Sequence, residues 1–354
     1  MPLPVHPPAR SALDCHHQLA PSASVRKDSL GECSKETTFE ILDYFVSQGG
    51  NFIDTANNYQ NEESEKWIGE WITQRQNRDQ LVLATKFSSG YKNHESDKLQ
   101  SNYGGNGAKS MRVSLELSLQ KLQTSYIDLF YLHWWDYTVS VPELMHSLND
   151  LVVSGKVIYL GISDCPAWVV AKANQYARDH GLRQFSVYQG LWNASFRDFE
   201  REILPMCRDE NMGLVPWGTL GQGQFHTEAG YKEREQNNPG RKGRPPSDSE
   251  ESVSKVLKTI ANSKETDPTS IALAYVRHKA PYVFPVVGGR NVEEMAQIEA
   301  AYPFDHGFPH TFLSGTLFDG SSPHTPDGPG CVWLTKLMGN FDWVKSGPPI
   351  EWTK

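Results

Sequence analysis

Short apolar segments alternate with longer amphipathic segments through most of the chain. The apolar segments carry few polar positions, which is typical of strands in a parallel sheet that helices cover. Such an alternation predicts an α/β fold of the (β/α)8 TIM-barrel type, in which one helix follows each strand. The predicted strands are residues 51–54, 80–86, 126–133, 157–163, 184–189, 212–217 and 282–287.

The amphipathic segments have the 3.6-residue period of helices that bury one face. An eight-stranded barrel requires one more strand before the first of them, and the sequence offers no candidate there. A glycine- and charge-rich stretch at residues 218–251 is predicted to be a long loop. The predicted helices are residues 35–48, 62–74, 108–122, 141–153, 166–180, 198–210, 252–261, 269–278 and 292–301.

The chain has 354 residues, which suits one barrel with insertions. Residues 1–31 are polar, contain proline and have no clear period, so an irregular segment is predicted there. Residues 32–302 form the predicted barrel domain. Residues 303–354 are rich in glycine, proline, serine and histidine and are predicted to be an irregular tail.

Charge and composition exclude several classes of protein. The formal net charge is −8, so a general nucleic-acid binder is not expected. No apolar run is long enough to cross a membrane, and the N-terminus lacks an apolar signal core, which together predict a cytoplasmic protein. The five cysteines form no CxxC pair, and the twelve histidines show no metal-ligand spacing, so neither a disulfide framework nor a metal site is predicted. No protein partner is predicted.

Three successive predicted strands end in a side chain that can carry charge or a proton. These side chains are Asp54, Lys86 and His133, and Tyr59 lies in the loop after the first strand. All strands of a parallel barrel open on one face at their carboxyl ends, so the four side chains are expected to converge there. Taken alone, Asp54 is equally well explained as a cap or turn residue.

The chemistry that suits this group is reduction of a carbonyl. The carbonyl oxygen gains negative charge as hydride reaches the carbon, and Tyr59 can then deliver a proton. An adjacent ammonium favours phenolate and so lowers the pKa of a phenol, while a carboxylate holds that ammonium in place. A histidine can hydrogen-bond the carbonyl oxygen. Protein side chains supply no hydride, so a nicotinamide cofactor is required.

The same residues lie in motifs that resemble the aldo-keto reductases. The motifs are Gly-Asn-Phe-Ile-Asp-Thr-Ala at 50–56 with Tyr59, Ala-Thr-Lys at 84–86, and Ile-Asp-Leu-Phe-Tyr-Leu-His at 127–133. The resemblance implies a TIM barrel that binds NADPH without a Rossmann domain. It also implies that Asp54, Tyr59, Lys86 and His133 are the catalytic residues.

Later motifs imply how the cofactor is bound. Ser163, Asp164 and Gln189 match positions at the nicotinamide carboxamide, although asparagine is more usual than Asp164. Trp217 matches an aromatic residue that stacks on the nicotinamide ring; from the pattern alone it would be assigned to the barrel core. The remaining implied cofactor residues, at the pyrophosphate and the 2′-phosphate, are Gly218, Thr219, Leu220, Gly221, Gln222, Gly223, Gly288, Arg290 and Glu294.

Four further segments resemble the fungal aryl-alcohol dehydrogenase branch of the family and its norsolorinic acid reductases: Asn57–Gln60, Asp164–Trp168, Ser186–Gly190 and Phe196–Arg201. The resemblance implies NADPH-dependent reduction of an aromatic polyketide ketone in mycotoxin biosynthesis, or interconversion of aryl aldehydes and alcohols. The substrate is then a small aromatic molecule. Trp134 and Trp192, together with His133, are candidates for contacting it; packing is an equally good explanation for both tryptophans.

The sequence also departs from the family pattern in two places. Relatives have a strand and a glycine turn before the first helix, and two helices where residues 293–302 form one. The barrel is therefore predicted to lack its first strand and part of its C-terminal helices. A strand missing from a barrel leaves sheet edges open. This departure favours an alternative function, a weakened or inactive NADP(H)-binding barrel that acts as a redox-sensing or regulatory subunit.

Overall fold

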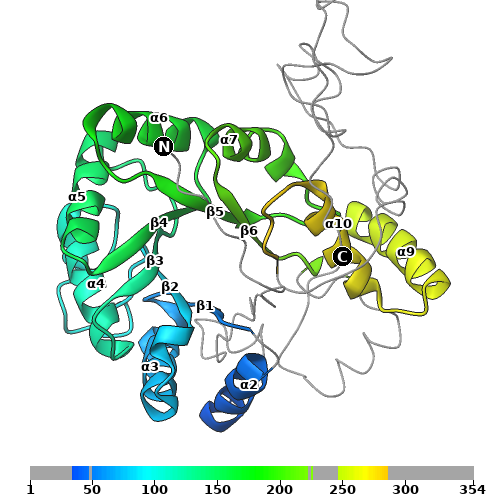
Figure 1. Ribbon diagram of the computed structural model, residues 1–354, viewed down its shortest axis with the longest axis horizontal. Coiled ribbons are helices and arrows are strands. Elements are labelled where there is room, and N and C mark those ends of the chain that lie inside the picture. The colour runs from blue at the N-terminus through cyan, green and yellow to red at the C-terminus, as the bar shows by residue number, and fades with distance from the viewer. Residues whose placement is uncertain (1–33, 48–49, 222–224, 226–245, 286–354) are drawn as a thin grey trace, which may run out of the picture.

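Six parallel strands form one curled sheet with helices on its outer side (Figure 1). The computed structural model describes residues 34–47, 50–221, 225 and 246–285. Each strand pairs with the next in the chain, so the sheet order is β1 to β6 without a crossover. The strands are β1 (Phe52–Asp54), β2 (Val82–Phe87), β3 (Ile127–Leu132), β4 (Val157–Ser163), β5 (Phe185–Leu191) and β6 (Gly213–Trp217).

This sheet is part of a (β/α)8 barrel. Six predicted strands are confirmed, and the seventh is reduced to a bridge between Leu214 and Val283 in the described part of the chain. The Leu214 N–H donates to the carbonyl of Tyr282 at 3.0 Å, and the Phe284 N–H donates to the Leu214 carbonyl at 2.9 Å. Among the described residues, β1 is the first strand of the sheet, and residues 1–33, in which no first strand was predicted, lie outside them.

The helices follow the predicted order, and none of those described is long and apolar enough to cross a membrane. The bounds of α5 agree with the prediction, and those of most others agree within a residue or two. The predicted helix at 292–301 lies outside the described residues. The helices are α2 (Lys35–Ser47), α3 (Glu63–Arg75), α4 (Ala108–Lys121), α5 (Val141–Val153), α6 (Ala167–His180), α7 (Ile203–Asp209), α9 (Asp248–Ser263) and α10 (Pro268–Lys279).

Two helix predictions are wrong in their bounds. The segment 198–210 is a short 3-10 turn at Asp198–Glu200 followed by α7, which begins at Ile203 and has Pro205 in its first turn. Proline has no N–H to bond the carbonyl of Arg201 and its ring clashes there, so the helix does not extend back through Arg201. The fully buried Glu200 pairs with Arg197 at 2.8 Å and with Lys279 at 3.1 Å. Helix α9 begins inside the predicted loop. A capping box starts it, since the Ser247 side chain accepts from the Glu250 N–H while Glu250 accepts from the Ser247 N–H.

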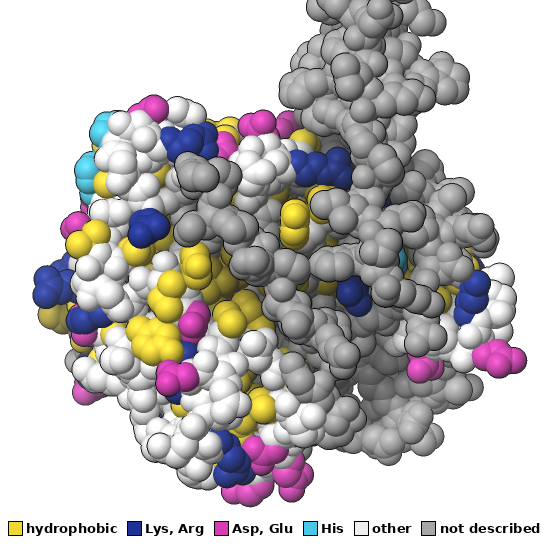
Figure 2. Space-filling view, viewed as in Figure 1, with side chains coloured by type: hydrophobic (Ala, Val, Ile, Leu, Met, Phe, Trp, Pro, Cys, Tyr) yellow, Lys and Arg dark blue, Asp and Glu magenta, His cyan; other side chains and the backbone are white. Residues whose placement is uncertain are grey.

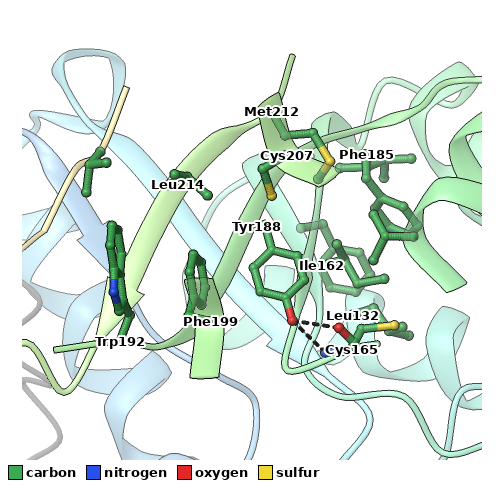
Figure 3. Packing of buried hydrophobic residues seen from close by; sticks show 14 of the residues in the cluster. Leu132, Ile162, Cys165, Phe185, Tyr188, Trp192, Phe199, Cys207, Met212 and Leu214 are labelled. Atoms are coloured by element: carbon green, nitrogen blue, oxygen red, sulfur yellow. Dashed lines mark hydrogen bonds between the residues drawn. The ribbon is translucent and has the colours of Figure 1, made fainter. Parts of the chain in front are cut away.

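A continuous apolar core lies between the sheet and the outer helices. Figure 3 shows its β5–β6 side, where the hydroxyl of the buried Tyr188 bonds the main chain of Cys165. That hydroxyl accepts from the Cys165 N–H at 3.0 Å and donates to its carbonyl at 2.7 Å. Burial also raises the pKa of Tyr188, so the phenol stays protonated in this contact. Tyr188 thus fixes the chain immediately after β4.

The surface over the curled sheet is largely apolar. Figure 2 shows apolar side chains gathered over the strands, with a few charged ones among them. On β4, Ile158 and Tyr159 are 44% and 60% exposed. Large apolar side chains on a strand are normally covered by a neighbouring layer. Ile158 and Tyr159 are successive residues, so their side chains point to opposite faces of β4, and both faces are open to solvent at this end of the strand.

Helices α3 and α4 approach closely at Gly69, and this contact gives a stability prediction. A Cβ at residue 69 would lie 2.1 Å from the carbonyl oxygen of Lys121 and 2.8 Å from the Leu122 Cα. Alanine gains about 1 kcal/mol of helix propensity over glycine, but overpacking against a main chain costs about 1–3 kcal/mol or more. Gly69→Ala is therefore expected to lower the free energy of unfolding, measured by urea titration.

The control for Gly69→Ala is Gly107→Ala. Residue 107 precedes α4, its φ is −65°, and a Cβ there has nothing within 4 Å. We expect Gly107→Ala to change the unfolding free energy by less than Gly69→Ala does. A Gly69→Ala protein as stable as the wild type would show that the two helices separate at little cost.

Candidate active site

The carboxyl ends of β1, β2 and β3 bring the predicted catalytic side chains together. Asp54 is the last residue of β1, Lys86 lies one residue before the end of β2, and His133 directly follows β3. The register pairs Asp54 with Ala84 and Lys86 with Tyr131, so these ends form one edge of the sheet. The convergence expected from the sequence is therefore present in the structure.

A buried ion pair forms the base of this site. Lys86 is fully buried, and its ammonium pairs with the Asp54 carboxylate, which is 7% exposed. Lys86 also donates to the carbonyl of Thr55 at 2.8 Å, and Gln189 Nε2 donates to Asp54 Oδ1 at 3.3 Å. The pKa of Lys86 is raised: burial acts to lower it, but the charge of Asp54 and the hydrogen bonds outweigh burial. Lys86 is thus an ammonium at neutral pH.

Tyr59 lies over this ion pair. The Lys86 Nζ is 5.2 Å from the centre of the Tyr59 ring, and the Tyr59 hydroxyl is one of its hydrogen-bond partners. The rings of Tyr59 and His133 meet edge to face, with centres 5.7 Å apart. A phenol, an ammonium and an imidazole therefore face one small volume, as proton transfer to a bound oxygen would require.

An unusual backbone turn holds Tyr59 in place. Gln60, Asn61 and Glu62 have φ values of 48°, 52° and 77°, all in the left-handed region. Left-handed backbone costs about 1–2 kcal/mol for each residue other than glycine, so the turn requires anchors. The buried Glu62 supplies them, since its carboxylate pairs with Lys92 and with Lys121, the latter at 2.9 Å. This anchor was not predicted from the sequence, although acidic Glu62 beside apolar helix positions was a possible signal.

A second group of side chains lies at the ends of β4, β5 and β6. Ser163 and Gln189 are buried, at 1% and 4% exposure, and Trp217 is half-buried. The Trp217 Nε1 lies 3.2 Å from each carboxylate oxygen of Asp164. The Asp164 N–H donates to the Gln189 carbonyl at 3.0 Å. Two buried polar side chains and a partly open indole thus lie beside the ion pair.

The turn after β6 is also built by specific contacts. Gly218 and Gly221 have φ values of 69° and 63°, and the Gly221 N–H donates to the Gly218 carbonyl at 2.9 Å. Asn193, a residue that the sequence analysis did not single out, donates to the same carbonyl at 3.0 Å. In this turn Thr219 is buried and Leu220 half-buried. The predicted phosphate-binding residues Gln222, Gly223, Gly288, Arg290 and Glu294 lie outside the described residues.

The two tryptophans predicted near the substrate have different environments. Trp134, next to His133, is 40% exposed, and its Nε1 donates to Ser89 Oγ at 3.0 Å. Trp192 is fully buried, stacks on Phe199 with ring centres 5.1 Å apart, and donates to Glu200 at 3.0 Å. The prediction that Trp192 contacts substrate is therefore replaced by the packing alternative. Phe199 covers the Trp192 ring and Glu200 accepts its N–H, so neither is open to a substrate.

His133 is neutral in the folded protein. Burial, reinforced by the charge of Lys86, lowers its pKa to about 3, and its Nδ1 is buried without a hydrogen-bond partner among the described residues. An unfolded histidine has a pKa of about 6.5, so between these values the unfolded chain binds a proton that the folded chain does not. Stability then rises with pH in this window and is lost as pH falls from about 6.5 toward 3.

The free energy of unfolding of His133→Gln is accordingly expected to fall less than that of the wild type as the pH is lowered. Urea unfolding midpoints of the wild type and the variant, measured from pH 4 to 7, check this. His146→Gln, which removes an exposed histidine of α5, is the matched control. A wild-type His133 that titrates near pH 6.5 by NMR would contradict the account.

The sequence is similar to that of known proteins over most of its length. Residues 23–307 match the aldo/keto reductase family. The chain is 62% identical to norsolorinic acid reductase B of Dothistroma septosporum, over 95% of this chain and 94% of that protein. It is 58% identical to norsolorinic acid reductase B of Aspergillus parasiticus, over 96% of this chain and 97% of that protein. An aryl-alcohol dehydrogenase of Pestalotiopsis microspora is 46% identical to this chain, over 95% of this chain and 93% of that protein.

These matches confirm the resemblance that the motifs indicated. The alignments with the two reductases extend over 367 and 372 positions, more than the 354 residues of this chain. Those relatives therefore have residues without a counterpart here, in keeping with the shortened barrel predicted from the sequence. The chain belongs to the aldo/keto reductase family and is an oxidoreductase.

Proposed function

We propose that the protein reduces the ketone of an aromatic polyketide to a secondary alcohol, with NADPH as the hydride donor. The observation that carries the proposal is the cluster of Tyr59, His133 and the buried Lys86–Asp54 ion pair. The names of the similar reductases make norsolorinic acid, or a ketone of the same class, the substrate to test first. Interconversion of aryl aldehydes and alcohols is the related activity that the aryl-alcohol dehydrogenase name suggests.

In this proposal Tyr59 is the proton donor. When bound, a nicotinamide would supply hydride to the carbonyl carbon. The carbonyl oxygen would take the proton of the Tyr59 hydroxyl as the C=O double bond becomes a C–OH single bond. The ammonium of Lys86 stabilises the phenolate that remains, and Asp54 keeps that ammonium in position. Solvent then returns a proton to Tyr59. General acid catalysis of this kind contributes about 10²–10⁴-fold to a rate.

The role proposed for His133 is to orient the carbonyl. With its pKa lowered to about 3, the ring is neutral at physiological pH and can offer an N–H to the oxygen. A neutral donor does not add a second positive charge beside Lys86. It therefore polarises the carbonyl without competing with Tyr59 as the acid.

The second group of side chains fits a nicotinamide. Ser163 and Gln189 are buried polar groups that can bond a carboxamide, and the half-buried Trp217 offers an aromatic face. We assign the ring to this position and the pyrophosphate to the turn at Gly218–Gly221, where glycines allow close approach. We propose that preference for NADPH over NADH rests on Gly288, Arg290 and Glu294, because an arginine guanidinium suits a 2′-phosphate.

We place the aromatic substrate against Trp134. Its partly exposed ring directly follows His133, so a flat ligand whose ketone reaches His133 would lie over it. Aromatic rings bury large areas and stack in offset or edge-on arrangements, which favours a polycyclic substrate. Small aryl aldehydes would use less of this surface.

A second candidate function follows from the shortened barrel. The described sheet has six strands, and the similar reductases have residues that this chain lacks. A barrel of this kind can bind a nicotinamide nucleotide with little turnover and act as a redox-sensing or regulatory subunit. The intact proton-transfer cluster favours the enzyme.

Fluorescence titration separates these proposals. NADPH and NADH are added to the purified protein, and quenching of tryptophan emission, to which Trp217 should contribute, reports binding. Norsolorinic acid and a simple aryl aldehyde are then supplied, and loss of NADPH absorbance is followed. We expect NADPH-selective quenching and turnover of the ketone. Quenching without turnover would favour the second candidate, and a folded protein that binds neither nucleotide would exclude both.

A further inference from the structure

We infer that Asp164 makes the site bind the oxidised, positively charged nicotinamide more tightly than the reduced, neutral one. The inference deepens the proposed function and rests on it, because it assumes that a nicotinamide nucleotide binds at the strand ends. Asp164 would then determine which redox state of the cofactor the protein favours.

The position of Asp164 is fixed by contacts on three strands. It directly follows β4, its N–H donates to the Gln189 carbonyl of β5 at 3.0 Å, and its two carboxylate oxygens each lie 3.2 Å from the Trp217 Nε1 of β6. Gln189 in turn reaches Asp54. The carboxylate thus lies beside the indole on which the nicotinamide ring is proposed to rest.

The charges of the cluster do not cancel. Lys86 and Asp54 neutralise each other as a buried ion pair, and His133 is uncharged. The carboxylate of Asp164 therefore leaves an excess negative charge at the strand ends. An oxidised nicotinamide ring carries a positive charge that would neutralise this excess, whereas a reduced ring is neutral. Coulomb attraction consequently favours the oxidised form.

The size of the preference follows from solvent access. Desolvation by the surrounding protein raises the pKa of Asp164, with the Trp217 hydrogen bond acting in the opposite direction, but the residue is exposed to solvent. Water therefore screens the carboxylate in part. Partly screened charge pairs change affinities by about fivefold. Binding of the two redox states and their interconversion form a thermodynamic cycle. The equilibrium for loss of hydride from the bound reduced cofactor is therefore shifted toward the oxidised form by the same factor.

The chain tolerates the variant that tests this role. The φ of Asp164 is 41°, in the left-handed region that asparagine and aspartate adopt more readily than other residues besides glycine. The Tyr188 hydroxyl holds the adjacent Cys165 main chain. Asp164→Asn keeps the turn, keeps an oxygen that can accept from the Trp217 N–H, and removes only the charge.

The experiment compares dissociation constants for NADP+ and NADPH, measured by calorimetry on the wild type, Asp164→Asn and Asp150→Asn. Asp150 is an exposed residue of α5, so its variant makes the same change in net charge away from the site. We expect Asp164→Asn to weaken NADP+ relative to NADPH by about fivefold, and Asp150→Asn to leave the ratio unchanged. Both nucleotides carry the same phosphates, so the ratio isolates the charge of the ring.

An unchanged ratio in Asp164→Asn would overturn the inference while leaving the proposed function intact. Failure of the wild type to bind either nucleotide would overturn both. A second measurement tests the inference even if the variant does not fold. In the wild type, the preference for NADP+ should decrease as the salt concentration is raised, because salt screens the attraction between the Asp164 carboxylate and the positively charged ring. A preference independent of salt would count against a charge effect.

Discussion

Replacing Tyr59 by phenylalanine is expected to lower kcat for ketone reduction by about 10²–10⁴-fold and to leave NADPH affinity within about twofold. Phenylalanine keeps the ring that meets His133 edge to face but removes the hydroxyl that hydrogen-bonds Lys86. The carbonyl oxygen would then take its proton from water. The defect should appear in kcat as well as kcat/KM, because the proton is transferred only in the transition state.

Steady-state kinetics of NADPH oxidation and a parallel fluorescence titration measure the two quantities. Tyr176→Phe is the matched control, since it removes a hydroxyl on helix α6 that contacts His146 at 3.1 Å, on the outside of the sheet. It should keep wild-type kinetics. A Tyr59→Phe protein that retains more than about a tenth of wild-type kcat would show that another group supplies the proton.

Lys86→Met is expected to abolish reduction and also to destabilise the fold by about 3–5 kcal/mol. Lys86 is fully buried, and its loss leaves the Asp54 carboxylate in the interior without its counterion, although Gln189 Nε2 still donates to Asp54 Oδ1 at 3.3 Å. Breaking a buried pair costs more than removing both partners, because the remaining charge has lost its counterion.

The double variant Lys86→Met, Asp54→Asn distinguishes the two effects. It should recover most of the stability, measured by urea unfolding, but none of the activity. A single variant as stable as the wild type would mean that Asp54 becomes protonated or hydrated at little cost. A double variant that regains activity would exclude the role proposed for Lys86.

Strand positions and the catalytic cluster were predictable because both depend on local patterns. An apolar strand that ends in Asp54, Lys86 or His133 is visible within a few residues, and parallel strands place such ends on one edge. The cluster therefore followed from the order of the strands without knowledge of side-chain packing.

The features that escaped prediction depend on residues far apart in the chain. Trp192 could not be assigned to the core without its stack on Phe199 and the ion pairs of Glu200, which involve Lys279 from α10.

The anchor of the Tyr59 turn escaped for a similar reason. Glu62 is buried because Lys121, at the end of α4, reaches it. A left-handed turn of three residues other than glycine has no simple sequence signal, since its cost is offset by partners elsewhere in the fold.

Hydride transfer from NADPH deuterated at C4 tests the central claim most directly. The purified protein is incubated with labelled NADPH and an aromatic polyketide ketone such as norsolorinic acid, and the alcohol is analysed by mass spectrometry. We predict an alcohol that carries one deuterium when the transferred C4 position is labelled and none when the other is labelled. A protein that binds NADPH but yields no labelled alcohol would contradict the assignment as a ketone reductase.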